Sequence, residues 1–333
     1  MTDRASEIAG FLAEAGWGQA VRAPLAGDAS ARRYERLATG GATAVLMDAP
    51  AGGDTPRFVE LAEWLSAEGY SAPRILARRP ERGLLLLEDL GDDLIAALVA
   101  ADPAREAGLY RAITDFLLDL HRRPAPDFLA PLDGAGLAGL VTLTADWYPV
   151  ASETAAAEIP ALIAQLYEAL DQEAPVMCLR DFHAQNILWL PAREGVARLG
   201  LLDFQDAVAA HPAYDLVSVL QDARREVSVR VERAEIRHYS SQKGLEQSRF
   251  EALYALLGAQ RSLRILGIFA RLSLAFGKAH YVDLIPRSWR YIERNLAHPH
   301  LHPLAKAVFA AYPAPDETLL QTLKDQCGTR PLP

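Results

Sequence analysis

Three polar residues in the second half of the sequence have the side chains that phosphoryl transfer requires. Asp181 and Asn186 stand in an Asp-x4-Asn pattern, and Asp203 ends the apolar stretch that follows. Moving a phosphoryl group to a hydroxyl needs one carboxylate to orient that hydroxyl and accept its proton, and amide and carboxylate oxygens to hold Mg²⁺ against the phosphates. The spacing therefore predicts Asp181 as the catalytic residue, and Asn186 and Asp203 as metal ligands.

Loop residues of these types also have an ordinary explanation. Asp and Asn are common in turns, where their side chains bond to nearby backbone groups, so a lone Asp181 would more simply be a turn residue. The combination favours chemistry, because His183 and Asn186 share the loop with Asp181 and a second apolar stretch leads into Asp203-Phe204.

The elements that must position these residues change in kind along the chain. An amphipathic helix is predicted within residues 1–16, and strand patterns then alternate with turn signals around one helix that begins at Thr55-Pro56. Helical periodicity dominates beyond residue 91, so the sequence predicts an α+β fold with a small antiparallel sheet first. The predicted strands are 33–38, 43–48, 74–78 and 84–88, with short ones between 176 and 206, and the main later helices are 104–121, 160–171 and 253–279.

The turn just before the first predicted strand, 33–38, carries candidate phosphate-binding residues. Gly27, Asp28, Ser30 and Arg32 lie in a stretch of small residues, where backbone N–H groups can approach an anion. A plain hairpin turn explains the same pattern equally well.

The charge balance excludes several classes of partner. The chain has 34 Lys and Arg against 43 Asp and Glu, a net charge of -9, whereas nucleic-acid and anionic-membrane binders rely on a clustered positive field. Residues 221–300 reverse the sign, with 14 basic and 8 acidic side chains. Solvated helix faces explain this excess, and so does an anionic substrate.

Cysteine content and hydropathy indicate the compartment. The two cysteines are too few and too far apart for a disulfide framework, and no apolar run approaches the roughly 18 residues of a membrane span. We expect a cytoplasmic protein, monomeric, that binds neither nucleic acid nor membrane.

The catalytic-loop pattern resembles that of the aminoglycoside phosphotransferase/choline kinase-like superfamily, which reads roughly His-Gly-Asp-x-His-x-x-Asn. Asp181, His183 and Asn186 match it, Leu179-Arg180 replace the His-Gly pair, and 211–216 is similar to the segment whose Asp braces the loop, here Asp215. The resemblance implies a protein-kinase-like fold of two lobes, 1–90 for nucleotide binding and 91–333 for catalysis and substrate binding. It also implies ATP and Mg²⁺ as cofactors, with adenine bonded by the backbone around Glu88 and Leu90.

One departure from that pattern concerns the third strand. The superfamily commonly has a Lys or Arg there that reaches the phosphates, and this chain has Met47, whose thioether cannot neutralise phosphate charge. Either another cation serves, with Arg32 and Arg33 nearest in sequence, or Mg²⁺ and backbone amides hold the nucleotide. A non-catalytic pseudokinase is the corresponding alternative.

Four segments resemble a narrower group, the bacterial anomeric N-acetylmuramate/N-acetylglucosamine kinases of peptidoglycan recycling. The resemblance implies a small-molecule sugar as substrate and phosphorylation of its anomeric hydroxyl. A kinase for an aminoglycoside or choline is the alternative, although such cationic substrates favour acidic clefts. The four segments are 27–34, 47–50, 179–186 and 260–272.

Overall fold

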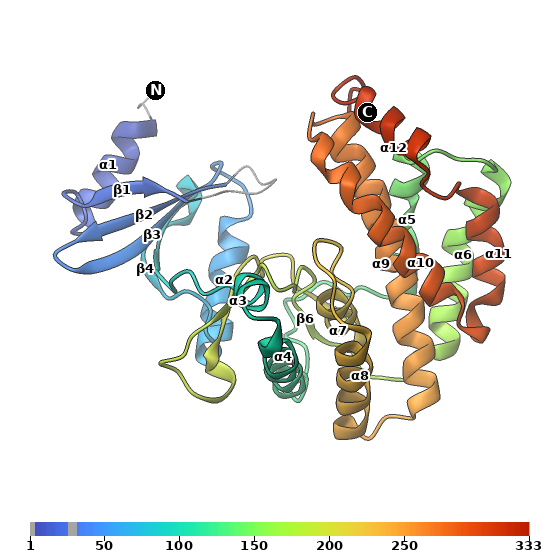
Figure 1. Cartoon of the computed structure of the whole chain (residues 1–333). Coiled ribbons are helices and arrows are strands. Elements are labelled where there is room, and N and C mark those ends of the chain that lie inside the picture. The colour runs from blue at the N-terminus through green and yellow to red at the C-terminus, as the bar shows by residue number, and fades with distance from the viewer. Residues whose placement is uncertain (1–3, 26–31, 333) are drawn as a thin grey trace. The chain divides into compact units, whose positions relative to one another are not determined.

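The computed structural model describes residues 4–25 and 32–332, which divide into two compact units (Figure 1). The smaller unit comprises the chain up to Arg105 together with Ala184–Asp206, and the larger comprises Glu106–His183 and the chain from Ala207 onward. The contact boundary thus follows Arg105 and the chain returns to the smaller unit later, whereas the sequence analysis placed one boundary after residue 90. The assignment of lobes at that boundary stays a prediction.

The smaller unit is built on one antiparallel sheet with strand order β1-β2-β3-β5-β4. The β2–β3 hairpin turns at Gly40 and Gly41, with φ values of 55° and 83° that glycine adopts without strain. The predicted small antiparallel sheet is confirmed. Its strands are β1 (Val21–Pro24), β2 (Arg33–Thr39), β3 (Ala42–Asp48), β4 (Ile75–Arg79) and β5 (Leu84–Glu88).

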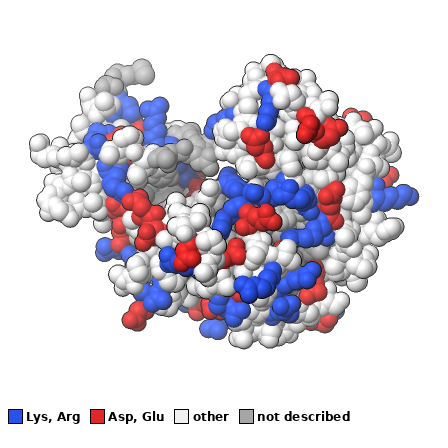
Figure 2. Space-filling view, in the orientation of Figure 1, with Lys and Arg blue, Asp and Glu red and all other residues white. Residues whose placement is uncertain are grey.

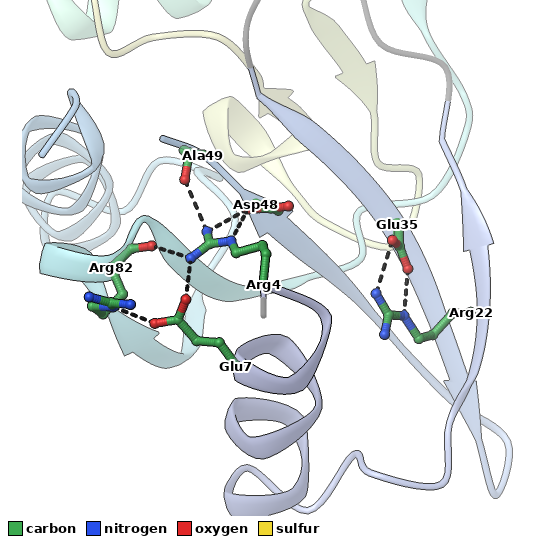
Figure 3. A network of polar contacts seen from close by, with 7 residues as sticks. All are labelled: Arg4, Glu7, Arg22, Glu35, Asp48, Ala49 and Arg82. Carbon is green, nitrogen blue, oxygen red and sulfur yellow. Dashed lines mark hydrogen bonds and ion pairs between the residues drawn. The ribbon is translucent and has the colours of Figure 1, made fainter. Parts of the chain in front are cut away.

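Helix α1 (Arg4–Glu14) covers this sheet, as its amphipathic pattern predicts. It buries one apolar stripe against the inward face of the strands, and its first residue ties it to the strand end, as Figure 3 shows. Arg4 donates to Asp48 at 2.5 Å, to the carbonyl of Ala49 at 3.0 Å and to that of Arg82 at 2.9 Å. The buried apolar cluster consists of Ile8, Phe11, Leu12, Leu37, Ala44, Leu46, Leu84 and Leu86.

The remaining elements of the smaller unit follow the sheet and return from residues 184–206. Helix α2 (Thr55–Ala67) begins with Pro56 in its first turn, as predicted. The short strands β7 (Ile187–Trp189) and β8 (Leu199–Leu201) pair with each other, and Ser71 bridges to Gly200. Short helices complete the unit: α3 (Ile95–Ala101), η1 (Pro80–Arg82), η2 (Pro103–Arg105) and η3 (Gly195–Arg198).

The larger unit is helical, and most of its helices pack against the long helix α9 (Gln247–Leu274), as Figure 1 shows. Two short strands of this unit, β6 (Val176–Cys178) and β9 (Val208–Ala210), pair with each other. The predicted α+β class is confirmed. The other helices are α4 (Glu106–Leu120), α5 (Gly134–Trp147), α6 (Glu153–Leu170), α7 (Ala213–Leu220), α8 (Val229–Lys243), α10 (Ile285–Leu296), α11 (His302–Ala311), α12 (Glu317–Asp325), η4 (Ala279–Leu284) and η5 (Pro299–Leu301).

One helix begins earlier than the sequence pattern indicated. Helix α6 starts at Glu153 rather than Pro160, because the Ser152 side chain accepts a hydrogen bond from the N–H of Ala155 and caps it. Pro160 is therefore inside the helix, where it lacks one N–H donor. No helix in the described ranges is long and apolar enough to cross a membrane.

Candidate active site

The loop that carries Asp181 is held in place by a buried carboxylate on α7. Asp215 accepts hydrogen bonds from the backbone N–H groups of Leu179, at 2.5 Å, and Arg180, at 2.9 Å. Burial raises the pKa of Asp215 to about 7, and these two N–H donors act in the opposite direction. The contact matches the bracing role that the resemblance assigned to Asp215.

Arg180 adopts a backbone conformation that few side chains accept. Its φ of 70° lies in the left-handed region, which costs a non-glycine residue about 1–2 kcal/mol. The surroundings hold it there: its carbonyl accepts from the hydroxyl of Ser218 at 3.1 Å and from Nη1 of Arg261 at 3.2 Å. Strain of this kind concentrates at functional sites.

The side chain of Asp181 combines partial exposure with strong positive surroundings. It is 38% exposed, and its Oδ1 lies 3.9 Å from Nη2 of Arg261. Burial acts to raise its pKa, but the nearby charges of Arg261 and Arg264 outweigh that effect and hold the pKa below its ordinary value. Asp181 is therefore ionised at neutral pH and can accept a hydrogen bond from a hydroxyl group.

His183, in the same loop, is neutral at working pH. Burial lowers its pKa to about 4, and its Nε2 lies 3.3 Å from Nη1 of Arg224. Because a guanidinium can only donate, this contact makes Nε2 the acceptor. Phe182 packs on Phe116 with ring centroids 5.6 Å apart, which anchors the loop to α4.

The two predicted metal ligands lie in the smaller unit, where β7 and β8 place them together. The N–H of Leu202 donates to the carbonyl of Asn186 at 2.9 Å. This hydrogen bond continues the β7–β8 pairing beyond the strand ends, to Asn186 and to the residue before Asp203. Asp203 has a φ of 55° and a side chain that is 47% exposed. The amide of Gln205 donates to its Oδ1 at 2.8 Å and orients it.

A cation stands beside Asp203, and it is Arg32. The Arg32 side chain is only 5% exposed, pairs with Asp54 at 2.5 Å and lies 3.8 Å from Oδ1 of Asp203. Its guanidinium also lies over the ring of Phe58, 6.0 Å from the centroid. Met47, by contrast, is fully buried in the sheet.

Sequence reasoning left the identity of this cation open and did not find Asp54. Arg33 begins β2 and is exposed, so of the two candidate arginines it is Arg32 that the fold brings to Asp203. Asp54 lies just before α2. In the sequence this position indicates only that a helix begins there, and that does not reveal which residue the carboxylate pairs with.

Comparison with known proteins places this geometry in a family. The model of the phosphotransferase enzyme family matches residues 21–251, more than half of the chain. The chain belongs to the phosphotransferase enzyme family. It is therefore an enzyme that transfers a phosphoryl group to an acceptor hydroxyl, and Asp181, Asn186 and Asp203 all lie inside the matched range.

Individual relatives of this phosphotransferase cover nearly its whole length. It is 41% identical to an N-acetylmuramate/N-acetylglucosamine kinase of Caulobacter vibrioides over 95% of this chain and 98% of that protein. A kinase of the same name from Pseudomonas aeruginosa is 33% identical over 86% of this chain and 88% of the relative.

Solved structures confirm the kinase-like fold. A choline/ethanolamine kinase family protein of Mesorhizobium loti superposes with a TM-score of 0.65 at 13% identity, covering 92% of this chain and 99% of the other. A choline kinase of Streptococcus pneumoniae gives 0.60 at 14% identity, over 88% and 100%. At such identities the likeness concerns the fold alone, and it confirms the predicted protein-kinase-like architecture.

The donor set of the phosphotransferase fits a hard divalent cation. Carboxylate and amide oxygens are the ligands that Mg²⁺ prefers, and Asp203 and Asn186 offer one of each from adjoining strand ends. Asp203 has a left-handed backbone and a side chain that is 47% exposed, so a cation can reach its carboxylate.

Of the other residues predicted to bind the cofactor, some lie in the part of the chain that the structure describes and some do not. Glu88 ends β5, and its carboxylate pairs with Arg193 at 2.8 Å. The N–H of Leu90 meets no acceptor among residues 4–25 and 32–332, so it can donate to a bound purine. Gly27, Asp28 and Ser30 lie outside the described residues.

Proposed function

We propose that this phosphotransferase is an ATP- and Mg²⁺-dependent kinase for the anomeric hydroxyl of N-acetylmuramate and N-acetylglucosamine, acting in cell-wall recycling. The observation that carries the proposal is the 41% identity to the Caulobacter vibrioides kinase over 95% of this chain. Relatives of the same name from Pseudomonas putida and Neisseria meningitidis, at 32% and 31% identity, support it. We place the enzyme in the cytoplasm, as a monomer.

Asp181 would act on the acceptor hydroxyl. Its ionised carboxylate accepts the hydrogen bond of the hydroxyl and then its proton, while the sugar oxygen forms a bond to the γ-phosphorus. The bond between that phosphorus and the bridging oxygen of ATP breaks, and ADP leaves with the electron pair. The arginines beside Asp181 support this role, since they keep the carboxylate charged before the hydroxyl arrives.

Asn186, Asp203 and Arg32 would serve the phosphates. Asn186 and Asp203 hold Mg²⁺, which when bound neutralises charge on the phosphate oxygens. Arg32 adds a guanidinium beside Asp203 and replaces the cation that Met47 cannot supply. Asp54 holds Arg32 in place, as the acidic partner of a phosphate-binding cation commonly does. Leu90 and the backbone at Glu88 would bond the adenine.

Two alternatives lose support from the same contacts. A cationic aminoglycoside or choline would meet Arg261 and Arg264 beside Asp181, and like charges repel. The pseudokinase hypothesis was motivated by Met47 alone, and Arg32 supplies the missing positive charge.

The test follows the product. Purified protein is supplied with ATP, Mg²⁺ and either amino sugar, and ADP release is measured together with reducing power. A sugar 1-phosphate has a blocked reducing end, so reducing power should fall in step with ADP release. Reducing power that persists while ADP appears would rule out the anomeric position. ADP release with choline or an aminoglycoside, and with neither sugar, would replace the proposed substrate.

A further inference from the structure

The segment 260–272 supplies charge to the catalytic loop, and no ligand has yet been assigned to its arginines. Two of its residues, Arg261 and Arg264, lie one turn apart on α9 and therefore share one helix face. With Arg180 they form a group of three guanidinium side chains around Asp181, which we call the arginine cluster. Figure 2 shows Lys and Arg gathered around a smaller group of acidic side chains on the face of the larger unit turned to the viewer.

The members of the arginine cluster are poorly satisfied by the protein itself. Arg261 is buried: its Nη1 donates to the carbonyl of Arg180 at 3.2 Å, its Nη2 lies 3.9 Å from Oδ1 of Asp181, and its guanidinium lies over the ring of Tyr214, 5.9 Å from the centroid. The Nε atoms of Arg180 and Arg261 are buried without a hydrogen-bond partner in the described part of the chain. Arg264 is partly buried and makes no hydrogen bond or ion pair with any residue that the structure describes.

The charge count of the cluster is unbalanced. Arg261 lies 3.9 Å from Asp181, and the positive charges of Arg264 and Arg180 also act on it, whereas the nearby Asp215 already accepts two backbone N–H groups. Burial and the neighbouring charges of Arg180 and Arg261 lower the pKa of Arg264 and outweigh the opposite effects of Tyr214 and Asp181. An unpaired buried charge is unfavourable unless a ligand neutralises it. An ordinary solvated helix face does not explain the cluster, because Arg261 is only 7% exposed.

We propose that the arginine cluster, with Arg264 as its uncommitted guanidinium, binds the carboxylate of the lactyl group that distinguishes N-acetylmuramate from N-acetylglucosamine. The proposal rests on the proposed function. A planar guanidinium matches a carboxylate with two parallel hydrogen bonds. The cluster surrounds Asp181, the residue assigned to the acceptor hydroxyl, whereas the cation assigned to phosphate, Arg32, lies beside Asp203 in the smaller unit. The cluster thus belongs to the acceptor rather than to the nucleotide.

The experiment compares two sugars in three variants. Arg264→Met removes the charge at similar length, Arg264→Lys keeps the charge, and Arg249→Met is the matched control, since Arg249 is exposed at the start of the same helix and bonds Gln172. For each protein, kcat/KM is measured for N-acetylmuramate and for N-acetylglucosamine, and the dissociation constant of each sugar is measured by calorimetry without nucleotide.

We expect Arg264→Met to lower the N-acetylmuramate to N-acetylglucosamine ratio of kcat/KM by about 10- to 100-fold, the range for one charged hydrogen bond. Arg264→Lys should lower this kcat/KM ratio less than Arg264→Met does, and Arg249→Met should leave it unchanged. An unchanged ratio in Arg264→Met would overturn the proposal. So would an equal loss for both sugars with unchanged sugar binding, which would assign the cluster to the transferred phosphate.

A second measurement on the unaltered protein keeps the proposal testable if Arg264→Met fails to fold. The carboxamide of N-acetylmuramate keeps the shape of the lactyl group but has no charge. We expect it to bind at least about tenfold more weakly than the acid, because the guanidinium loses its ionic partner. Equal binding would refute the carboxylate subsite while leaving the kinase activity in place. If the unaltered protein phosphorylates neither sugar, the proposed function itself has failed.

Discussion

Two side chains, one in each unit, carry the roles that we propose for single residues in the reaction. Asp181 is kept ionised by arginines although burial opposes it, so it is prepared to orient a hydroxyl. Asp203 is held in a left-handed backbone conformation, and its carboxylate is half exposed. A metal ion can therefore reach this carboxylate. Both arrangements fit the roles that we propose for these residues in phosphoryl transfer.

We expect Asp181→Asn to lower kcat by about 10²- to 10⁴-fold, because an amide cannot accept the proton of the hydroxyl. The dissociation constant of ATP with Mg²⁺ should stay nearly the same, since the proposed metal ligands are untouched. Single-turnover kinetics and calorimetry measure the two quantities. A comparable loss of nucleotide affinity would contradict the assignment of Asp181.

Arg32 and Arg33 are adjacent in sequence and differ in environment, which makes them a matched pair. Arg32→Met should weaken ATP binding by about 10- to 100-fold, because the cation beside Asp203 is lost. Arg33→Met, at an exposed position, should leave that affinity nearly unchanged. Calorimetric titration with ATP and Mg²⁺ compares them. If the two variants behave alike, Arg32 is not the phosphate-binding cation.

At the scale of elements, α9 positions both Arg261 and Arg264, and its packing against α5 fixes its place in the larger unit. The hydroxyl of Thr144 on α5 donates to the carbonyl of Leu263 on α9 at 2.7 Å. A Cβ at Gly267 would lie only 2.8 Å from the backbone of Leu143 and Thr144. The helices therefore touch at a glycine, and no side chain fits between them.

Gly267→Ala should destabilise the larger unit by about 1–3 kcal/mol, because backbone atoms of α5 cannot move aside as a flexible side chain could. Gly139→Ala is the control on α5 itself, since a Cβ there meets nothing within 4 Å. Alanine has the higher helix propensity, so this control should stabilise by about 0.5–1 kcal/mol. Urea unfolding measures both, and a neutral Gly267→Ala would contradict the close packing.

At the scale of the whole molecule, buried histidines link stability to pH. Burial lowers the pKa of His121 and His211 to about 3 and that of His183 to about 4. In the unfolded chain each would titrate near 6.5. Between those values the unfolded state binds protons that the folded state does not, so stability falls as pH falls below about 6.5.

The free energy of unfolding should therefore be lower at pH 5 than at pH 7.5. Each of the three histidines costs about 2 kcal/mol at pH 5, and Asp215 opposes them, because its raised pKa gives the folded state a proton in the same window. The combined effect of the three histidines exceeds that of Asp215, so we expect a net loss of stability at pH 5. Urea unfolding at several pH values gives the slope, and constant or rising stability toward pH 5 would contradict the neutral buried histidines.

Local sequence patterns were enough to predict most of the elements and to propose the catalytic and metal-binding residues. Glycine pairs, a proline in a first helical turn and apolar periodicity are local signals, and they placed β2, β3 and α2 within a residue or two of their observed limits. Asp181, Asn186 and Asp203 were recognisable because their spacing within one stretch of chain meets a chemical requirement. The structure supports these assignments, and their roles stay predictions.

Which charges lie near those residues became visible only in the folded chain. Arg32 and Asp203 are far apart in sequence, as are Arg261 and Asp181, yet each pair lies within 4 Å. The burial of Met47 likewise depends on how the sheet is covered. Local periodicity gives the direction of a side chain within its own element, whereas its neighbours depend on how distant elements pack, and that is why the cation and the arginine cluster emerged only from the folded chain.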